Sequence, residues 1–118
     1  MGFHPKSVVA RFNLGNLLYR IGEAEAAEEE MRVLIEDAPE KPRAYLYLAR
    51  IVLAERQDLE EVETLAQTGL ELAEADELKA LGYYLLADVY SRQNRRAELE
   101  QVLERAQYYR SRLEGAGG

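Results

Sequence analysis

Apolar residues recur three and four positions apart along almost the whole chain, with charged residues between them. This period is typical of an α-helix that buries one face, whereas a half-buried strand alternates apolar and polar residues. The pattern predicts six helices, at about residues 6–21, 24–37, 43–56, 58–74, 76–92 and from 94 onward, and no strand. The sequence therefore predicts an all-α protein.

Residues that end or begin helices lie between these stretches. Gly22 follows the first stretch, as C-terminal glycines do, and Pro39 and Pro42 bracket the connection between the second and third. Asp58, with Glu61 three residues later, resembles a capping box. We also expect Asp76 and Asn94 to cap the fifth and sixth helices, because short polar side chains favour that position.

Five of the predicted helices carry a clear row of apolar residues. We expect those of the second, third, fifth and sixth helices to form the buried faces. The rows are Val9, Phe12 or Asn13, Leu17 and Ile21; Ala27, Met31, Leu34 and Ile35; Tyr45, Leu48, Val52 and Leu53; Tyr83, Leu86, Ala87 and Tyr90; and Leu99, Val102, Leu103 and Ala106.

Small residues mark a repetition along the chain. Gly15 and Ala49 hold equivalent places, and Ala87 holds the third place after a slightly longer interval. A leucine precedes each of them. We expect a small residue at these places because the two helices of a hairpin cross closely there.

The repeated residues resemble the tetratricopeptide repeat, a helix-turn-helix unit whose period of about 34 residues equals the interval from Gly15 to Ala49. The matching residues are Arg11, Leu14, Gly15, Leu18, Ala27, Met31, Leu34 and Pro39; Tyr45, Leu48, Ala49, Val52, Val62, Ala66 and Gly69; and Tyr83, Leu86, Ala87, Tyr90, Leu99, Leu103 and Ala106. The resemblance implies a right-handed superhelical α-solenoid of three hairpins, at about residues 8–41, 42–75 and 80–113. It implies one domain over residues 1–118, with a flexible tail at 114–118.

Three departures from the family pattern affect the expected packing. Arg11 replaces the usual aromatic residue, so the first repeat is expected to act as an N-terminal cap. Val62 and Leu99 are bulkier than the expected small residue and should open their helix crossings slightly. The longer second interval places one extra residue near Gln57 and three near Glu74, so we expect the fourth helix to be about one turn longer.

Composition narrows the classes of function. The chain of 118 residues has no cysteine and a net charge of −7, which argues against a thiolate metal site and against binding of nucleic acid. No apolar run reaches the ~20 residues that span a bilayer, and no N-terminal signal pattern is present. We expect no cofactor and no membrane insertion, and we favour a cytoplasmic location.

Charge separates between alternate helices. The first and third predicted helices are net positive, whereas the second and fourth are strongly negative. In a tetratricopeptide stack the first helix of each hairpin lines the concave face, so the resemblance implies a mildly basic groove. The residues that we place in this groove are Phe12, Asn16, Tyr19, Arg20, Leu46, Tyr47, Arg50, Tyr84, Asp88 and Arg92.

Aromatic and arginine side chains together are typical of protein-binding surfaces, because they combine contact area with a bidentate grip on carboxylates. We therefore expect a non-enzymatic module that binds a partner peptide or protein segment, with Arg50 at the centre of its groove. Some family members hold a terminal carboxylate with Lys and Asn. Only Asn16 matches that set here, whereas Phe12, Tyr47, Leu81 and Leu85 occupy the other places.

Two alternatives remain open from the sequence. The sixth helix could leave the face with Leu99, Val102, Ala106 and Tyr109 uncovered, which would favour a homo-oligomer, or the chain could be a fragment of a larger scaffold. No residue pattern in the sequence supports catalysis, because His4 is the one histidine and the serines lack a nearby base. No metal site is expected either.

Overall fold

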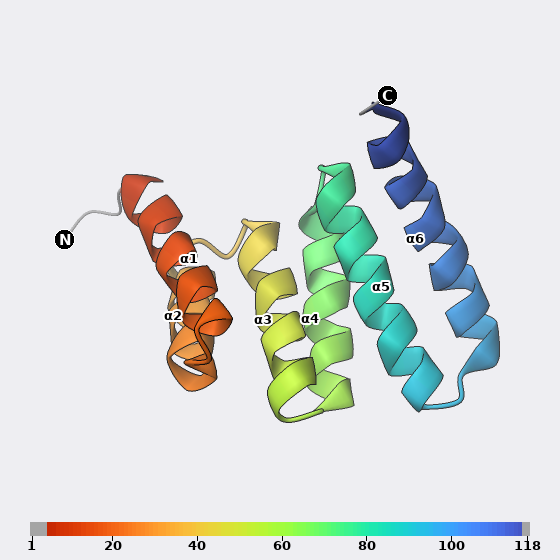
Figure 1. Ribbon diagram of the computed structural model, residues 1–118, viewed down its shortest axis with the longest axis horizontal. Helices are drawn as coiled ribbons and strands as arrows, with labels where there is room; N and C mark the ends of the chain where they lie inside the picture. Colours follow the sequence, from red (N-terminus) through yellow and green to blue (C-terminus); the bar gives the residue numbers. More distant parts are fainter. Residues whose placement is uncertain (1–4, 117–118) are drawn as a thin grey trace.

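The computed structural model describes residues 5–116, which form six helices and no strand. The prediction of an all-α protein is confirmed. The helices are α1 (Pro5–Arg20), α2 (Ala24–Asp37), α3 (Pro42–Glu55), α4 (Leu59–Leu72), α5 (Asp76–Arg92) and α6 (Arg96–Ala116). Figure 1 shows them as consecutive antiparallel pairs, with α2 behind α1 and α6 at the far edge.

Two predictions about helix ends differ from the structure. The fourth helix was expected to be about one turn longer, but α4 has 14 residues, as α2 and α3 do, and it ends at Leu72, two residues before the predicted end. The backbone becomes extended at Ala73 (φ −72°, ψ 136°), whose side chain joins the core. Of the flexible tail predicted at residues 114–118, residues 114–116 belong to α6. Residues 117 and 118 lie outside the described part of the chain, as do His4 and the residues before it.

Of the three predicted capping residues, one is confirmed. The Oδ1 atom of Asp58 accepts a hydrogen bond of 3.2 Å from the backbone N–H of Glu61. Asp76 is instead the first residue of α5, and its carboxylate accepts a hydrogen bond of 2.9 Å from Arg112. Asn94 has a φ of 57° and precedes α6 by two positions, since asparagine tolerates the left-handed conformation of a tight turn.

The three hairpin turns share one backbone feature. Gly22, Gln57 and Asn94 have positive φ values of 92°, 54° and 57°, and each lies two positions before the helix that follows. In the first and third turns the next residue donates its N–H to a carbonyl five positions earlier, from Glu23 to Leu18 (2.8 Å) and from Arg95 to Tyr90 (2.9 Å). This pattern ends a helix tightly and starts its antiparallel partner.

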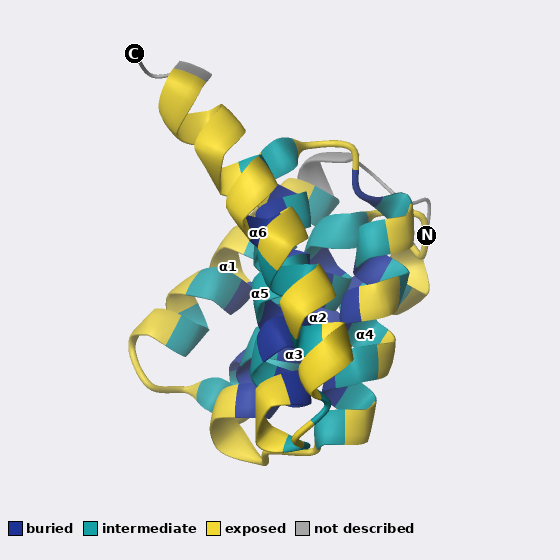
Figure 2. Ribbon diagram, turned by 90° about the vertical axis from the view of Figure 1, so that its right-hand side faces the viewer, coloured by how far each residue is buried: buried dark blue, intermediate teal, exposed yellow. Residues whose placement is uncertain are grey.

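The six helices pack in chain order. Each helix packs against the next, and the backbones of α1, α3 and α5 also approach one another in series. Among the described residues the backbones of α2, α4 and α6 do not, and α2 is joined to α4 by the side chains of Arg32 and Glu61 instead. The first helices of the hairpins therefore form one continuous layer. Figure 2 shows buried residues gathered between the helices and exposed turns at the C-terminal end of α6.

Glycines allow three of the close helix approaches. A Cβ atom on Gly15 would lie 2.8 Å from Met31 of α2, which confirms the crossing expected there. A Cβ on Gly69 would lie 2.6 Å from Leu46 of α3, and one on Gly82 would lie 2.6 Å from Leu70 of α4. These distances are shorter than van der Waals contact, so the helices are closer than alanine would allow.

The apolar row of the first helix lies outside the core. Val9, Leu17 and Ile21 have exposed fractions of 60%, 52% and 64%, because α1 turns its other face, with Leu18 and Tyr19, toward α2 and α3.

The opposite holds for the sixth helix, whose apolar face could have been uncovered in one of the two alternatives that the sequence left open. Ala106 is fully buried, and Leu99 and Val102 pack against the core. The ring of Tyr109 stacks on that of Tyr83 from α5, with centroids 5.9 Å apart. The alternative of an open face on α6 is therefore wrong, because α5 covers it.

Candidate functional site

Five of the predicted groove residues meet between α1 and α3. Phe12, Asn16 and Tyr19 come from α1, at three- and four-residue spacing, so that they share one face of the helix. Tyr47 and Arg50 come from the facing side of α3. The rings of Phe12 and Tyr47 are 4.8 Å apart at 59°, which joins the two helices by an aromatic contact.

Arg50 lies at the centre of this group. Its Cζ atom is 4.5 Å from the ring centroid of Tyr47 and 5.1 Å from that of Tyr19. Within residues 5–116, its side chain makes one long hydrogen bond of 3.5 Å, to the Oδ1 atom of Asn16, and its buried Nε–H meets no acceptor. Two tyrosine rings thus hold a guanidinium whose hydrogen-bonding capacity is mostly unused.

An open hollow of about 590 Å³ lies beside this guanidinium. We call it the Arg50 hollow. It is lined by Asn16, Tyr19, Arg20, Tyr47, Arg50 and Glu55. Arg20, also predicted for the groove, therefore lies next to Arg50, and the two cations share the hollow with a single carboxylate.

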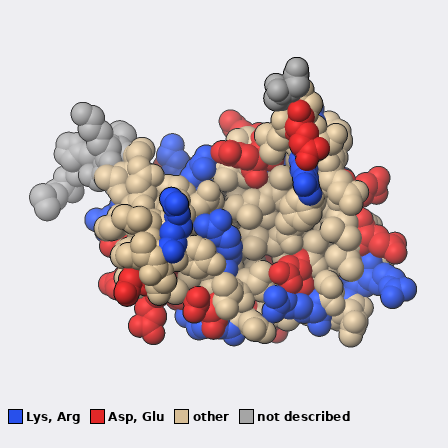
Figure 3. All heavy atoms as spheres, viewed as in Figure 1, with Lys and Arg blue, Asp and Glu red and all other residues tan. Residues whose placement is uncertain are grey.

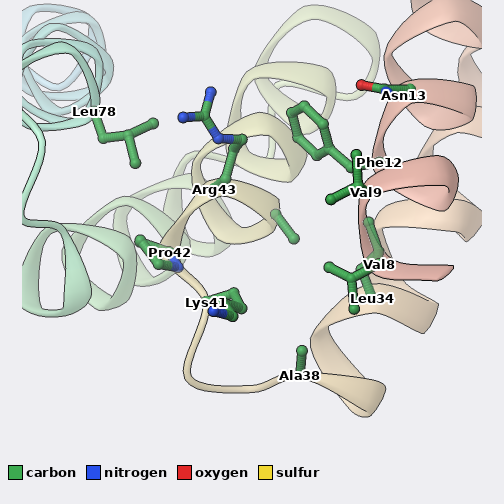
Figure 4. A pocket seen from close by; sticks show the side chains of 11 residues that line it. Val8, Val9, Phe12, Asn13, Leu34, Ala38, Lys41, Pro42, Arg43 and Leu78 are labelled. Atoms are coloured by element: carbon green, nitrogen blue, oxygen red, sulfur yellow. The ribbon is translucent and has the colours of Figure 1, made fainter. Parts of the chain in front are cut away.

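A second hollow, of about 520 Å³, lies between the N-terminal ends of α1 and α3. We call it the apolar hollow, because most of its lining is aliphatic or aromatic. Its lining residues are Val8, Val9, Phe12, Asn13, Leu34, Ala38, Lys41, Pro42, Arg43, Ala44 and Leu78. In Figure 4, Val8, Val9 and Phe12 lie on α1, across the hollow from Pro42 and Arg43.

The sequence pattern did not predict the apolar hollow. One signal was available, because Val8 and Val9 are neighbours and cannot both face the partner helix of the hairpin. Phe12 joins the two hollows, since it lines the apolar hollow and packs against Tyr47 of the Arg50 hollow. The Cζ atom of Arg43 lies 5.6 Å from the ring centroid of Phe12.

Leu46 does not belong to the groove, and its prediction is wrong. Its side chain is fully buried and occupies the space that Gly69 of α4 leaves free. Neighbouring residues on a helix point about 100° apart, so Leu46 faces α4 while Tyr47 faces α1.

The three predicted residues of α5 are not drawn into the Arg50 group. The Nε atom of Arg92 donates a hydrogen bond of 2.7 Å to Asp88, so these two charges satisfy each other. Tyr84 lies toward α6, where Tyr84 and then Glu114 raise the pKa of Arg110. Among the described residues, the α5 part of the predicted groove is thus a separate patch.

Arginines also connect α2 with α4. Arg56, at the end of α3, donates hydrogen bonds to Glu28 of α2 (2.8 Å) and Glu61 of α4 (2.7 Å), and Arg32 of α2 contacts the same two carboxylates. The hydrogen bond to Glu28 is the largest cause of the raised pKa of Arg56. The acidic surfaces of the second and fourth helices therefore provide partners for arginines, which the sequence pattern did not predict.

An equivalent connection links the last two hairpins. Arg95 precedes α6 and bonds to Glu63 of α4 at 2.9 Å, as Arg56 bonds to Glu28. Glu63 and Glu28 are both the fifth residue of their helices. Ion pairs thus recur at corresponding places of successive hairpins.

The charges visible in Figure 3 agree with the predicted positive charge of the first and third helices. Basic side chains gather over α1 and α3 on the face that the figure presents, beside a hollowed, mostly uncharged surface.

No described helix is long and apolar enough to cross a membrane. Within residues 5–116, no group of acidic or histidine side chains is placed to hold a metal ion.

Comparison with known proteins assigns no function to this chain. No protein-family model and no curated protein matches the sequence. The class of protein that the observations define is an all-α protein of six helices packed in chain order, with two hollows between α1 and α3.

Proposed function

We propose that the chain is a tetratricopeptide-type α-solenoid with a right-handed superhelical twist, and that it is a non-enzymatic module that binds a segment of a partner protein. The shared hairpin turns, the glycine crossings and the continuous layer of α1, α3 and α5 support the repeat architecture. The partner segment would lie along the α1–α3 part of this layer. No cofactor and no nucleic acid is part of the proposal.

The environment of Arg50 carries this proposal. A half-buried guanidinium held over two tyrosine rings, whose terminal nitrogens make one long hydrogen bond within residues 5–116, offers positioned donors to an acceptor in the hollow. The residue types around it are those that dominate the binding energy of protein interfaces. A carboxylate in the Arg50 hollow would supply acceptors to the edge of the guanidinium.

The test is capture of partners from the source cells with immobilised protein. We expect Arg50→Gln to lower recovery of the captured partner at least tenfold, whereas Arg96→Gln, an exposed arginine on α6, leaves recovery unchanged. Thermal unfolding of both variants checks that the fold is retained. Equal recovery with wild type and Arg50→Gln would remove the groove from the proposal.

Self-association is a second candidate, and the exposed row on α1 favours it. Val9, Leu14 and Leu17 of α1, and Ile21 directly after it, are all exposed, and several large exposed apolar residues in one segment favour a contact site. Light scattering over a concentration series tests it. A mass that rises with concentration, and falls to that of one chain in Leu17→Ser, would support contact through α1 rather than α6.

A further inference from the structure

The two hollows lie along one path between the same pair of helices. The apolar hollow is lined from α1 and α3 by residues up to Asn13 and Ala44, with further residues from outside these helices, and the Arg50 hollow is lined by residues farther along both helices, from Asn16 and Tyr47 onward. Phe12 and Asn16, one helical turn apart on α1, line the first and second hollow respectively. A bound chain could therefore occupy both hollows at once.

The charges along this path favour an acidic ligand. Arg20, Lys41, Arg43 and Arg50 line the two hollows, against the single carboxylate of Glu55. Arg43 is bonded to Glu77 at 2.9 Å, whereas Arg50 is held in place by two tyrosine rings and makes one long hydrogen bond within residues 5–116, so Arg50 is the positioned cation that a carboxylate would meet. The apolar hollow, in contrast, offers aliphatic surface that only an apolar side chain would cover favourably.

Helix geometry gives the distance between a contact in the apolar hollow and a contact in the Arg50 hollow. Arg43 and Arg50 line different hollows and are seven positions apart on α3, which corresponds to about 10 Å at ~1.5 Å per residue. An extended chain advances ~3.3 Å per residue, so this distance corresponds to about three residues of a bound peptide.

We infer that the partner segment is an extended acidic peptide in which a large apolar side chain fills the apolar hollow while a carboxylate, about three residues away, binds Arg50. This inference rests on the proposed groove function and adds the composition and spacing of the ligand. The apolar contact contributes affinity through burial, and the carboxylate fixes the position of the peptide along the groove.

The experiment is selection of random octapeptides on the wild-type protein, with removal of peptides that also bind Arg50→Gln. We expect the retained peptides to carry Leu, Ile, Met or Phe three positions from Asp or Glu. In a selected peptide, replacing the acid by its amide should weaken binding to wild type at least tenfold, and should have little effect on Arg50→Gln.

A matched pair of variants tests the apolar contact. Val9 of α1 lines the apolar hollow, whereas Leu113 of α6 is an exposed apolar residue that lines neither hollow. We expect Val9→Ser to weaken binding of the selected peptides several-fold and Leu113→Ser to leave it unchanged.

The possible failures are distinguishable. Peptides that depend on Arg50 but show no apolar residue at that spacing, or equal binding by Val9→Ser and wild type, would overturn the two-point ligand and leave the proposed groove intact. A selection that returns no Arg50-dependent peptide would overturn both.

Discussion

Gln57 has a backbone conformation for which glycine is better suited. Its φ of 54° matches the left-handed turn that Gly22 forms at the corresponding place of the first hairpin. A side chain in that region costs ~1–2 kcal/mol, and the greater freedom of glycine in the unfolded chain offsets part of the gain. We expect Gln57→Gly to raise the free energy of unfolding by about 0.5–1 kcal/mol in urea titrations.

Gly22→Ala provides the opposite case. Nothing lies within 4 Å of the Cβ that it would add, and its φ is 92°, so only the backbone is strained. A loss of about 1 kcal/mol is expected for this variant. If both substitutions changed stability in the same direction, the shared turn conformation would not be the cause.

Tyr90 provides a pH-dependent contribution to stability. Burial, and then the charge of Glu63, raises the pKa of Tyr90 above its ordinary value of 10.0. The folded state therefore keeps the phenol proton at pH values where the unfolded chain loses it. This contribution is complete below pH 10 and is lost as the pH rises through the folded-state pKa.

We expect the free energy of unfolding to fall less steeply above pH 10 in Tyr90→Phe than in wild type, measured by urea titration at pH 8 and above pH 10. At pH 8 the variant should already be less stable, because the hydrogen bond of 3.2 Å to Glu63 is gone. Tyr108→Phe, at an exposed tyrosine on α6, is the control. The same slope in wild type and Tyr90→Phe would contradict the assignment.

Single residues of the site differ in how far the sequence could place them. Asn16, Tyr19, Tyr47 and Arg50 were predictable because polar and aromatic residues on an otherwise apolar helix mark its open side. Leu46 was not, because α3 is buried on several sides, with Ala44, Leu46, Leu48, Ala49 and Ile51 all in the core. An apolar period cannot separate a core face from a groove face on such a helix.

At the scale of the helices, the number of helices and their order follow from the period of apolar residues. Gly22 and Asp58 were predicted at helix ends, and the structure places them there. The end of α4 was not predictable in this way. Helix-forming residues continue past Leu72, but the chain leaves the helix so that Ala73 is buried. Tertiary packing overrides local propensity there.

The close approach of α3 and α4 gives a test at the same scale. A Cβ on Gly69 would lie 2.6 Å from Leu46, whose side chain is fully buried in the core. We expect Gly69→Ala to lower the free energy of unfolding by about 1–3 kcal/mol, despite the better helix propensity of alanine.

Gly115→Ala is the matched control for this test, since its Cβ would meet nothing within 4 Å on α6. That variant should be neutral or slightly stabilising. Urea titration of both variants distinguishes crowding between helices from a general effect of removing glycine, and an unchanged Gly69→Ala variant would contradict the crowding.

At the scale of the whole molecule, stability should rise from the N-terminal helix toward the middle. Gly15 is the one buried residue among residues 8–20 of α1, whereas α3 has seven buried residues. Few buried contacts allow local opening, so we expect amide hydrogens of α1 to exchange at least tenfold faster than those of α3. Equal protection, measured by mass spectrometry or NMR, would mean that the chain opens only as one unit.

The ion pairs of α2 and α4 have a consequence for the spacing between hairpins. Apolar packing connects α1, α3 and α5, but α2 and α4 are connected across hairpins by Arg32, Arg56 and Arg95 on partly exposed carboxylates. Dissolved salt weakens such pairs and hardly affects apolar packing. Raising the ionic strength should therefore separate α2 from α4 while α1, α3 and α5 stay packed, and small-angle scattering would record a change in the dimensions of the molecule without unfolding.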